Sequence, residues 1–418
     1  SQSHRRVKKQ LFSVVIMDWF CFTTHRYSMK HILVFLIVFC VAYILLINIY
    51  LKDTSKIKSS YINIFPERYY SKREIKRILF WTRNFKSIHW QTYDYYSTSD
   101  AFKGCPVSKC IVTADKTLVN DSDALLFHSQ DLTNIILPSH RSPEQIYILA
   151  GVEPPTNYNI MNLGQYSNVF NWTMGYRFDM DAFMAYGSFE KSSVNMAVKN
   201  VDFSKNKTHK VAWAVGNCYP YFPRQLIVQK LSKYIDVDIF GHCGKTKPKC
   251  SRLCPEILGK YKFYLSFENS MCKDYVTEKF WNALVRKQIP IVLGGANYTK
   301  IAPPKSFINV MDFPNIEKLA EHLHYLDKNH TAYNEYFKWR SHFTVSGKFT
   351  PWRCELCKVL HDTSRPAQVY TDIVGWLGED NCPLRSVSIR LNVSQRWLTH
   401  SRSLIKSRRW PSKLLGLF

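Results

Sequence analysis

Acidic residues are scarce in this 418-residue sequence, which has 32 Asp and Glu against 57 Lys and Arg and a formal net charge of +25. Such an excess of positive charge invites a nucleic-acid-binding interpretation. The sequence lacks any RRM-like, zinc-finger or helix-turn-helix pattern that would support it. Much of the excess lies in residues 52–72 and in the tail "RSLIKSRRWPSK". The remaining positive charge could favour an anionic substrate.

The sequence also lacks an internal repeat, which argues against a repeat architecture. Apolar residues make up 46% of the chain and aromatic residues 15%, so folded domains are expected instead of disorder. A chain of 418 residues is long enough for two hydrophobic cores.

One apolar run stands apart at residues 32–51, "ILVFLIVFCVAYILLINIYL", in which only Asn48 is plainly polar. About 20 such residues are needed to cross a bilayer as a helix, whereas a cleavable signal peptide has an apolar part of about 7–15. The stretch "LKDTSKIKSS" at its end offers no good small-residue cleavage site. We therefore expect a transmembrane anchor at 32–51, a cytosolic tail at 1–31 and a stem at 52–75. Because Met29 directly precedes the run, residues 1–28 are a candidate for sequence upstream of the natural start.

Basic residues flank the anchor on both sides, so charge alone does not give its orientation. Ten of the 12 cysteines follow the anchor, and an even set of cysteines suits disulfides in an oxidising compartment. Potential N-glycosylation sequons, each weak alone, also lie only after it, at Asn120, Asn171, Asn206, Asn297, Asn329 and Asn392. Together these features predict that the large C-terminal region faces a secretory lumen.

Strand-like and helix-like stretches alternate through most of this region. Strands are predicted at "KRILFWT", "SDALLFH", "QIYILAG", "KVAWAVGN", "VDIFG", "YKFYLSF", "IPIVLGG" and "SFINVMDF", and helices at "RQLIVQKLSKYI", "TEKFWNALVRK" and "NIEKLAEHLHYL". This alternation indicates α/β domains with mostly parallel, doubly wound sheets. We expect two Rossmann-like domains facing a cleft, an N-terminal one at 76–205 and a C-terminal one at 206–380, followed by a basic tail of unknown role at 381–418.

The stretch "FENSMCKDYVTEKFWNAL" gathers polar side chains between a predicted strand and a predicted helix. Thr277 is the expected N-cap, and Val276 is expected to pack onto Trp281. The buried face of the helix is predicted to consist of Phe280, Trp281, Leu284 and Val285. Ligands of open α/β sheets bind at such a junction, and free helix N–H groups favour phosphate. A solvated loop is the alternative interpretation of the polar residues Asn269, Tyr275, Glu278 and Lys279.

This stretch, followed by "IPIVLGG", closely resembles the donor-binding motif of the α-1,3-fucosyltransferases. Further landmarks in the family's order are "CPVSKCIVTAD", "FNWTMGYRFDMDAFMAYG", "VAWAVGNC" and "FTPWRCELC", so the resemblance extends from about residue 78 to residue 380. It implies a single-pass type II protein of the Golgi membrane with a lumenal GT-B-like catalytic region of two Rossmann-like domains. It also implies transfer of fucose from GDP-fucose, with inversion and in α-1,3 linkage, to N-acetylglucosamine of glycoprotein or glycolipid glycans.

The resemblance assigns the catalytic base to Glu153. This residue, in "GVEPPTN", matches the family's Glu-Ser-Pro motif, although Pro154 stands where the family usually has serine. A base is needed to take the proton from the acceptor hydroxyl as the fucosyl carbon is attacked. The alternative for Glu153 is an ordinary loop carboxylate. Arg177, in "YRFDMD", is a further candidate for donor binding or for support of the base.

The resemblance also implies a donor site. Lys279 and Arg224 match phosphate-binding positions, where positive charge would stabilise the departing GDP; for Arg224 the alternative is a surface residue at a helix start. Glu278, Tyr275 and Asn269 match further donor-site positions. Glu278 is expected to contact ribose or to stabilise developing positive charge.

No metal or other cofactor is expected to be required, although a divalent ion could stimulate turnover by aiding product release. The pairs Asp179/Asp181 and Asp236/Asp238 have the D-x-D pattern of metal-dependent glycosyltransferases, but this tripeptide is common. The first pair lies in a segment that the family does not use as a metal clamp, and the second alternates within a predicted strand. Disulfides are favoured over zinc for the cysteines in an oxidising lumen.

By resemblance, Cys105 and Cys110 pair with Cys354 and Cys357. The pairing of the other lumenal cysteines stays open, because six cysteines allow fifteen connectivities; these are Cys218, Cys243, Cys250, Cys254, Cys272 and Cys382.

The acceptor glycan also stays open. Vertebrate Lewis-type members carry a His-His-Arg/Trp-Asp/Glu motif where this chain reads "FHSQD", so that His128 and Asp131 remain while Ser129 and Gln130 depart. Both a Lewis-type and a core N-glycan acceptor are therefore candidates. The alternative function is that of a non-catalytic lumenal relative that binds nucleotide sugar or glycan. Against it, Glu153, Arg224, Glu278 and Lys279 are all intact. No nucleic-acid partner is expected, and the sequence does not indicate an oligomeric state.

Overall fold

The structure, a computed structural model, describes residues 61–65, 71–83, 100–133, 135–157, 160–192, 201–218, 220, 222–244, 246, 255–378 and 381–382. Within these ranges, no helix is long and apolar enough to cross a membrane. The predicted anchor at 32–51 lies outside them, as do the cytosolic tail, much of the stem and all but the first two residues of the basic tail.

The first sheet has six strands, all parallel, in the order β3-β2-β4-β5-β6-β7. The strands are β2 (Lys76–Phe80), β3 (Cys110–Thr113), β4 (Ala124–His128), β5 (Ile146–Gly151), β6 (Trp172–Gly175) and β7 (Ala182–Phe183). All three strands predicted here, "KRILFWT", "SDALLFH" and "QIYILAG", are present. Among the described connections, short 3-10 turns take the place of crossover α-helices: η2 (Asp100–Phe102), η3 (Lys116–Asp121), η4 (Ser129–Asp131), η5 (Pro155–Asn157) and η6 (Ile160–Tyr166).

The second sheet has five parallel strands in the order β10-β9-β11-β12-β13. They are β9 (His209–Ala214), β10 (Val237–Phe240), β11 (Tyr261–Phe267), β12 (Ile289–Leu293) and β13 (Ile308–Asn309). Every residue of the central strand β11 is buried, which explains its continuous apolar run. The predicted strand "SFINVMDF" is shorter than expected, because the Asn309 side chain accepts from the Met311 amide and starts the 3-10 turn η7 (Val310–Asp312).

The α-helices of the described residues are α3 (Arg224–Leu231), α4 (Pro255–Leu258), α5 (Glu278–Val285), α6 (Tyr298–Ile301), α7 (Ile316–Lys328), α8 (His330–Glu335), α9 (Trp352–His361) and α10 (Ile373–Leu377). The three helices that the sequence predicts are present as α3, α5 and α7. Helix α5 buries Phe280, Trp281 and Leu284, as predicted. The prediction for Val285 is wrong, because this residue ends the helix and is 48% exposed.

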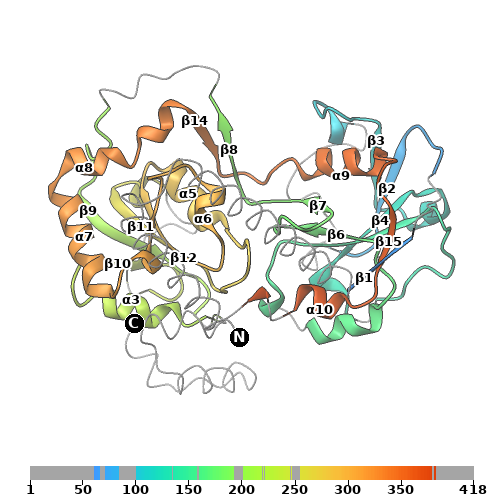
Figure 1. Cartoon of the computed structure of the whole chain (residues 1–418), viewed down its shortest axis with the longest axis horizontal. Coiled ribbons are helices and arrows are strands. Elements are labelled where there is room, and N and C mark those ends of the chain that lie inside the picture. Colours follow the sequence, from blue (N-terminus) through green and yellow to red (C-terminus); the bar gives the residue numbers. More distant parts are fainter. Residues whose placement is uncertain are drawn as a thin grey trace, which may run out of the picture. The chain divides into compact units, whose positions relative to one another are not determined.

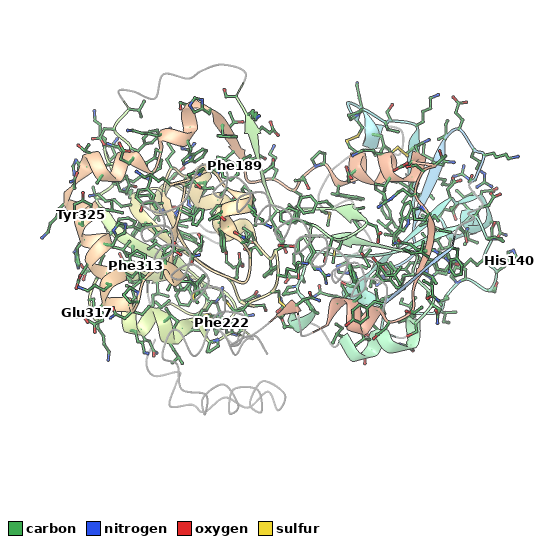
Figure 2. All side chains as sticks on the ribbon, viewed as in Figure 1. His140, Phe189, Phe222, Phe313, Glu317 and Tyr325 are labelled. Carbon is green, nitrogen blue, oxygen red and sulfur yellow. A yellow bond between two sulfur atoms is a disulfide. The ribbon has the colours of Figure 1, made fainter. Side chains whose placement is uncertain are left out.

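Two antiparallel pairs join segments that are far apart in the sequence. Strand β8 (Ser188–Lys191) pairs with β14 (Phe343–Ser346), and β1 (Ile62–Phe65) pairs with β15 (Ala367–Tyr370). Phe189, labelled in Figure 2, lies on β8. Its ring packs on Trp281 and Trp339, with centroids 5.3 and 5.2 Å apart.

The chain returns to the first sheet after β14. Helix α9 packs its buried face onto one side of that sheet, and β15 and α10 pack onto the other (Figure 1). Disulfides Cys105–Cys354 and Cys110–Cys357 hold α9 there, and these are the four cysteines that the family resemblance pairs. The linear boundary at 206–380 places this returning segment in the C-terminal domain, whereas the disulfide pairing implied by the resemblance ties it to the start of the first domain.

Two further disulfides answer part of the open connectivity. Cys218 bonds to Cys243, and Cys272 bonds to Cys382. Cys250 and Cys254 lie outside the described residues. The second bond attaches the loop after β11 to the segment after α10, where the Lys273 amide also donates to the Asn381 carbonyl at 2.7 Å.

Candidate active site

The junction between β11 and α5 is organised around a fully buried carboxylate, Glu268. The Thr277 amide donates to Glu268 Oε1 at 2.8 Å, and the Thr277 hydroxyl donates to the same atom at 3.0 Å. Lys279 Nζ donates to Glu268 Oε2 at 3.1 Å. Thr277 is therefore the N-cap residue of α5, as predicted, but its own side chain makes no capping bond. Glu268 instead accepts the hydrogen bond of the Thr277 amide.

Close packing at the end of β12 fixes this loop. Gly295 allows the approach, because a Cβ atom there would lie 2.5 Å from the carbonyl oxygens of Met271 and Cys272. The Glu268 amide donates to the Leu293 carbonyl at 2.9 Å. The pair of glycines in "IPIVLGG" thus belongs to the site as much as to the strand.

Lys279 shares its ammonium among three protein oxygens. Besides Glu268, it donates to Thr277 Oγ1 at 2.7 Å and to Glu278 Oε1 at 3.2 Å. Burial by itself would lower the pKa of Lys279, but the Glu268 and Glu278 carboxylates raise it above its usual value. Lys279 is therefore a charged ammonium at neutral pH.

The carboxyl of Glu268 experiences opposing influences. Burial raises its pKa, whereas the Lys279 ammonium and the Thr277 amide favour the ionised form. Because the carboxylate accepts from three donors within 3.1 Å, the ion pair with Lys279 is the state that the geometry favours at neutral pH.

Arg224 and Asn269 lie together beside the same junction. The Arg224 guanidinium is buried and donates to the Phe267 carbonyl at the end of β11. It has no ion-pair partner among the residues that the structure describes, and neither its Nε atom nor Asn269 Oδ1 has a hydrogen-bond partner there. The Asn269 carbonyl accepts from the Phe222 amide at 2.9 Å, which joins the loop to the start of α3. Unpaired buried polar atoms are costly, so these atoms are candidates for contact with a ligand.

Glu153 lies after β5 of the first sheet and meets the loop of the second sheet directly. The Tyr275 hydroxyl donates to Glu153 Oε2 at 3.3 Å, and Asn157 Nδ2 donates to the same atom at 2.6 Å. The Tyr275 ring is buried against Tyr176 at 5.0 Å. Burial is the main reason why the pKa of Tyr275 lies well above its usual value, and the neighbouring Tyr186 and Glu153 raise it further. The hydroxyl therefore keeps its proton and can donate a hydrogen bond.

A small pocket opens at the carboxyl ends of β4, β5 and β6. Its lining includes Ser129, Glu153, Tyr176 and Arg177, together with Leu377 at the end of α10. Ser129 Oγ is buried there without a hydrogen-bond partner in the described part of the chain. The carboxyl edge of a parallel sheet is where α/β proteins bind ligands, and Glu153 lies on it.

Arg177 lines this pocket, which includes none of the other predicted donor residues in its lining. Its guanidinium forms two bonds to Asp179, at 2.8 and 2.9 Å, and one to the Trp376 carbonyl at 2.7 Å. Arg177 is therefore held by protein groups, and its position suits support of the pocket better than contact with a diphosphate.

The two D-x-D pairs have protein partners. Asp179 binds Arg177 and Lys273, which lower its pKa to about 2 although burial alone would raise it. Asp181 accepts from the Thr173 amide and the Tyr370 hydroxyl. Asp236 pairs with Lys210, and Asp238 accepts from the Tyr261 hydroxyl. Within the described ranges, one set of potential metal ligands lies close together, namely Cys110, Cys357 and His361. The two cysteines of this set form a disulfide with each other.

The potential glycosylation sites differ in exposure. Asn120, Asn206 and Asn297 are exposed, Asn329 is partly buried, and Asn392 lies outside the described residues. Asn171 is partly buried, and its side chain is bonded inside the fold. Its Nδ2 atom donates to the Gln368 carbonyl and its Oδ1 atom accepts from the Tyr147 amide, both at 2.9 Å. Because its amide is engaged inside the fold, we do not expect a glycan at Asn171.

Sequence reasoning missed Glu268 as a member of the site. Glu268 is part of the motif, but a carboxylate directly after a buried strand is expected to be exposed to solvent unless its partners are known. The signal was the pair of hydrogen-bonding residues Thr277 and Lys279 that follow in the same motif.

Two family descriptions match the chain. "Fucosyltransferase, N-terminal" matches residues 73–187, and "Glycosyltransferase family 10 (fucosyltransferase) C-term" matches residues 204–376. A crystal structure of an α1,3-fucosyltransferase with GDP-fucose aligns with a TM-score of 0.44 and 16% identity over 74% of this chain and 96% of that chain. A score this low does not establish a shared fold, so family membership depends on sequence.

Sequence relatives give that support. Alpha-(1,3)-fucosyltransferase C of Drosophila melanogaster is 33% identical over 371 residues, which cover 80% of this chain and 85% of that protein. Glycoprotein 3-alpha-L-fucosyltransferase A of the same organism is 39% identical over 298 residues, 68% of this chain and 57% of that protein. The human 3-galactosyl-N-acetylglucosaminide 4-alpha-L-fucosyltransferase FUT3 is 37% identical over 276 residues, 64% of this chain and 74% of that protein. The chain therefore belongs to the α-1,3-fucosyltransferases of glycosyltransferase family 10 and is an enzyme of that family.

Proposed function

We propose that the enzyme transfers fucose from GDP-fucose to the 3-hydroxyl of an N-acetylglucosamine residue in a glycan, with inversion at the fucosyl carbon. One observation carries the proposal. Glu153, on the edge of the first sheet, accepts a hydrogen bond from the Tyr275 hydroxyl in the β11–α5 loop at 3.3 Å. The same loop leads to Lys279, and Arg224 lies beside it at the end of β11. The names of the Drosophila relatives support the 3-linkage.

The donor half of the proposal rests on Arg224 and Asn269. The buried Arg224 guanidinium makes no salt bridge in the described residues, and the nearby Glu268 and Glu278 carboxylates also serve Lys279. A diphosphate supplies a further counter-charge together with acceptors for the free Nε–H. Asn269 Oδ1 can accept from a ribose hydroxyl or the base. Binding of GDP would thus satisfy atoms that have no partner in the described part of the protein.

Lys279 contributes charge to the same diphosphate. Its bond to Glu278 is the one that a phosphate oxygen can replace, because Glu278 is 49% exposed while Glu268 is fully buried. Glu278, once released, is free to contact ribose. Positive charge held in place before the reaction stabilises the negative charge that grows as GDP leaves.

The acceptor half rests on Glu153. In the proposed step the acceptor oxygen forms a bond to the fucosyl carbon while the bond from that carbon to the β-phosphate oxygen breaks. The acceptor proton passes to the Glu153 carboxylate, and GDP leaves with the bonding electrons. Attack from the face opposite GDP inverts the configuration. Tyr275 and Asn157 hold the carboxylate in place, which is the usual requirement for an effective base.

The proposal needs no metal ion for the diphosphate, because Arg224 and Lys279 supply positive charge. The carboxylates Asp179 and Asp181, which resemble a metal clamp in sequence, are engaged with Arg177, Lys273 and Tyr370.

We also propose that the protein is a single-pass type II protein of the Golgi membrane. The apolar run at 32–51, with sequons and most cysteines only after it, supports this topology. Protease treatment of intact microsomes should leave the large C-terminal region undigested. Digestion of this region from outside would contradict the topology.

Incubation of the full chain with labelled GDP-fucose and a panel of glycans tests the function. We expect label in glycans that present N-acetylglucosamine, either in N-acetyllactosamine or in the N-glycan core, and the panel tells these acceptors apart. A protein that binds GDP but moves no label to any glycan would instead be a binding relative.

A further inference from the structure

The loop between β6 and β7 presents an aromatic ring to solvent. Phe178 is 54% exposed and stacks on the half-buried Phe183, with ring centroids 5.1 Å apart and an interplanar angle of 17°. The other exposed aromatic side chains of the described residues are Phe65, Tyr234 and Tyr325. These lie on β1, after α3 and on α7, parts of the chain that contribute no residue to the Glu153 pocket.

The backbone that carries Phe178 is held on both sides. Arg177 before it is fixed by Asp179 and the Trp376 carbonyl, and Asp179 after it pairs with Lys273 at 2.9 Å. The Phe178 amide itself donates to Asp274 Oδ2 at 3.4 Å. These contacts hold the backbone of the loop, and stacking on Phe183 orients the exposed ring.

That position is beside the proposed base. Arg177 and Met180, on either side of Phe178 in the loop, line the pocket that contains Glu153. Asp274, which accepts from the Phe178 amide, precedes Tyr275, whose hydroxyl donates to Glu153. Phe178 therefore lies beside the pocket, next to two of its lining residues. The half-exposed ammonium of Lys273, which pairs with Asp179, and the carboxylate of Asp274 are charged groups close to the same loop.

We propose that Phe178, supported by Phe183, is a platform for a sugar ring of the acceptor glycan. This inference rests on the proposed function, because it assigns the substrate of the Glu153 pocket. A pyranose has one face of C–H groups and an edge of hydroxyls. The C–H face gains by leaving water for an aromatic face, whose negative quadrupole attracts C–H dipoles. The hydroxyl edge would meet Lys273 and its partner Asp179.

A purely structural role does not account for the exposed ring. The Phe178 side chain has about half of its surface in water, so its contribution to the core is small, and the contacts that fix the loop come from the backbone and from neighbouring side chains. Phe178→Ala should therefore leave the fold intact and remove the platform alone. Phe178→Tyr keeps the ring and should rescue the loss.

The test varies the acceptor and the donor separately with the full chain. N-acetyllactosamine and an N-glycan core pentasaccharide are the acceptor probes. For the acceptor that is used, Phe178→Ala should raise KM by about 5–15-fold, with little change in kcat and in the affinity for GDP. Phe178→Tyr should keep an acceptor KM close to that of the unmodified protein. Tyr325→Ala is the matched control, because Tyr325 is also 54% exposed but lies on α7 (Figure 2).

Saturation-transfer NMR with the same two glycans gives a readout that does not need turnover. If a glycan gives a signal with the unmodified protein and none with Phe178→Ala, the platform is supported. This holds even if no fucose is transferred, and only the proposed function then fails. An acceptor KM that is unchanged in Phe178→Ala overturns the inference. A glycan signal with Phe178→Ala equal to that of the unmodified protein also overturns it, as does an equal loss of GDP and glycan binding. None of these outcomes contradicts the proposed fucose transfer.

Discussion

Replacing Lys279 by methionine separates the structural role of this residue from its role toward the donor. The change keeps most of the apolar stem and removes the charge that pairs with the fully buried Glu268. Loss of one partner of a buried ion pair costs about 3–5 kcal/mol. Because Glu268 keeps the amide and hydroxyl of Thr277 as donors, the lower end of this range, about 3 kcal/mol, is expected near neutral pH.

The cost should depend on pH in a definite direction. Burial already raises the pKa of Glu268, and Lys279 is the largest influence that opposes the rise. Without Lys279 the pKa in the folded state rises further. A carboxyl whose folded pKa lies above its unfolded value adds stability below the unfolded pKa, and this stability is lost as the pH rises through the folded pKa. The deficit of Lys279→Met relative to the unmodified protein should therefore be largest at alkaline pH and shrink as the pH falls.

Urea unfolding followed by tryptophan fluorescence measures this deficit at several pH values, and calorimetric titration with GDP measures the donor site. The double variant Lys279→Met/Glu268→Gln removes the buried charge and should recover most of the stability at alkaline pH. It should still bind GDP more weakly than the unmodified protein. A deficit that does not change with pH, or a double variant no more stable than the single one, would refute the buried ion pair. Recovery of GDP affinity in the double variant would remove Lys279 from the donor site.

Three further predictions concern the base, the metal and the disulfides. Glu153→Gln should bind GDP normally and lose roughly 10²–10⁴-fold in kcat, as for a missing general base; full turnover by steady-state assay would leave the base unassigned. Turnover should persist in EDTA, and complete loss that Mn²⁺ restores would revive the metal role of Asp179 and Asp181. The disulfides Cys105–Cys354 and Cys110–Cys357 close loops with sequence separations of 249 and 247. Removing both should cost about 5 kcal/mol in unfolding free energy, while removing one should cost much less, because the other holds the same segments; equal losses in urea unfolding would contradict this.

Local sequence patterns predicted the strands of the second sheet well. The run "YKFYLSF" is buried on both faces as β11, and "TEKFWNALVRK" contains α5. Such elements follow from apolar periodicity and capping residues, which act over a few residues. The error at Val285 has the same origin, because apolar periodicity does not show that this last residue of α5 is exposed to solvent.

Features that depend on distant contacts could not be predicted in this way. The return of α9, β15 and α10 to the first sheet has no signature in the local apolar pattern. For α9 alone, the disulfide pairing that the family resemblance implies points to it. The same limit applies to Arg177. The sequence makes it a candidate for donor binding or for support of the base, and its bond to the Trp376 carbonyl, 199 positions away, emerges only in the folded chain. The link between Tyr275 and Glu153 joins residues 122 positions apart and emerges only from the fold.

One measurement tests the central proposal most directly, namely NMR observation of the reaction of the full chain with GDP-fucose and the N-acetylglucosamine-containing glycans. Fucose is β-linked in GDP-fucose, so an inverting transfer gives an α-fucoside. We predict that the α-anomeric signal of fucose on O3 of N-acetylglucosamine grows at the rate at which free GDP appears, and that Glu153→Gln suppresses both. Free GDP without a glycoside, a β-fucoside, or a glycoside on another hydroxyl would contradict the proposal.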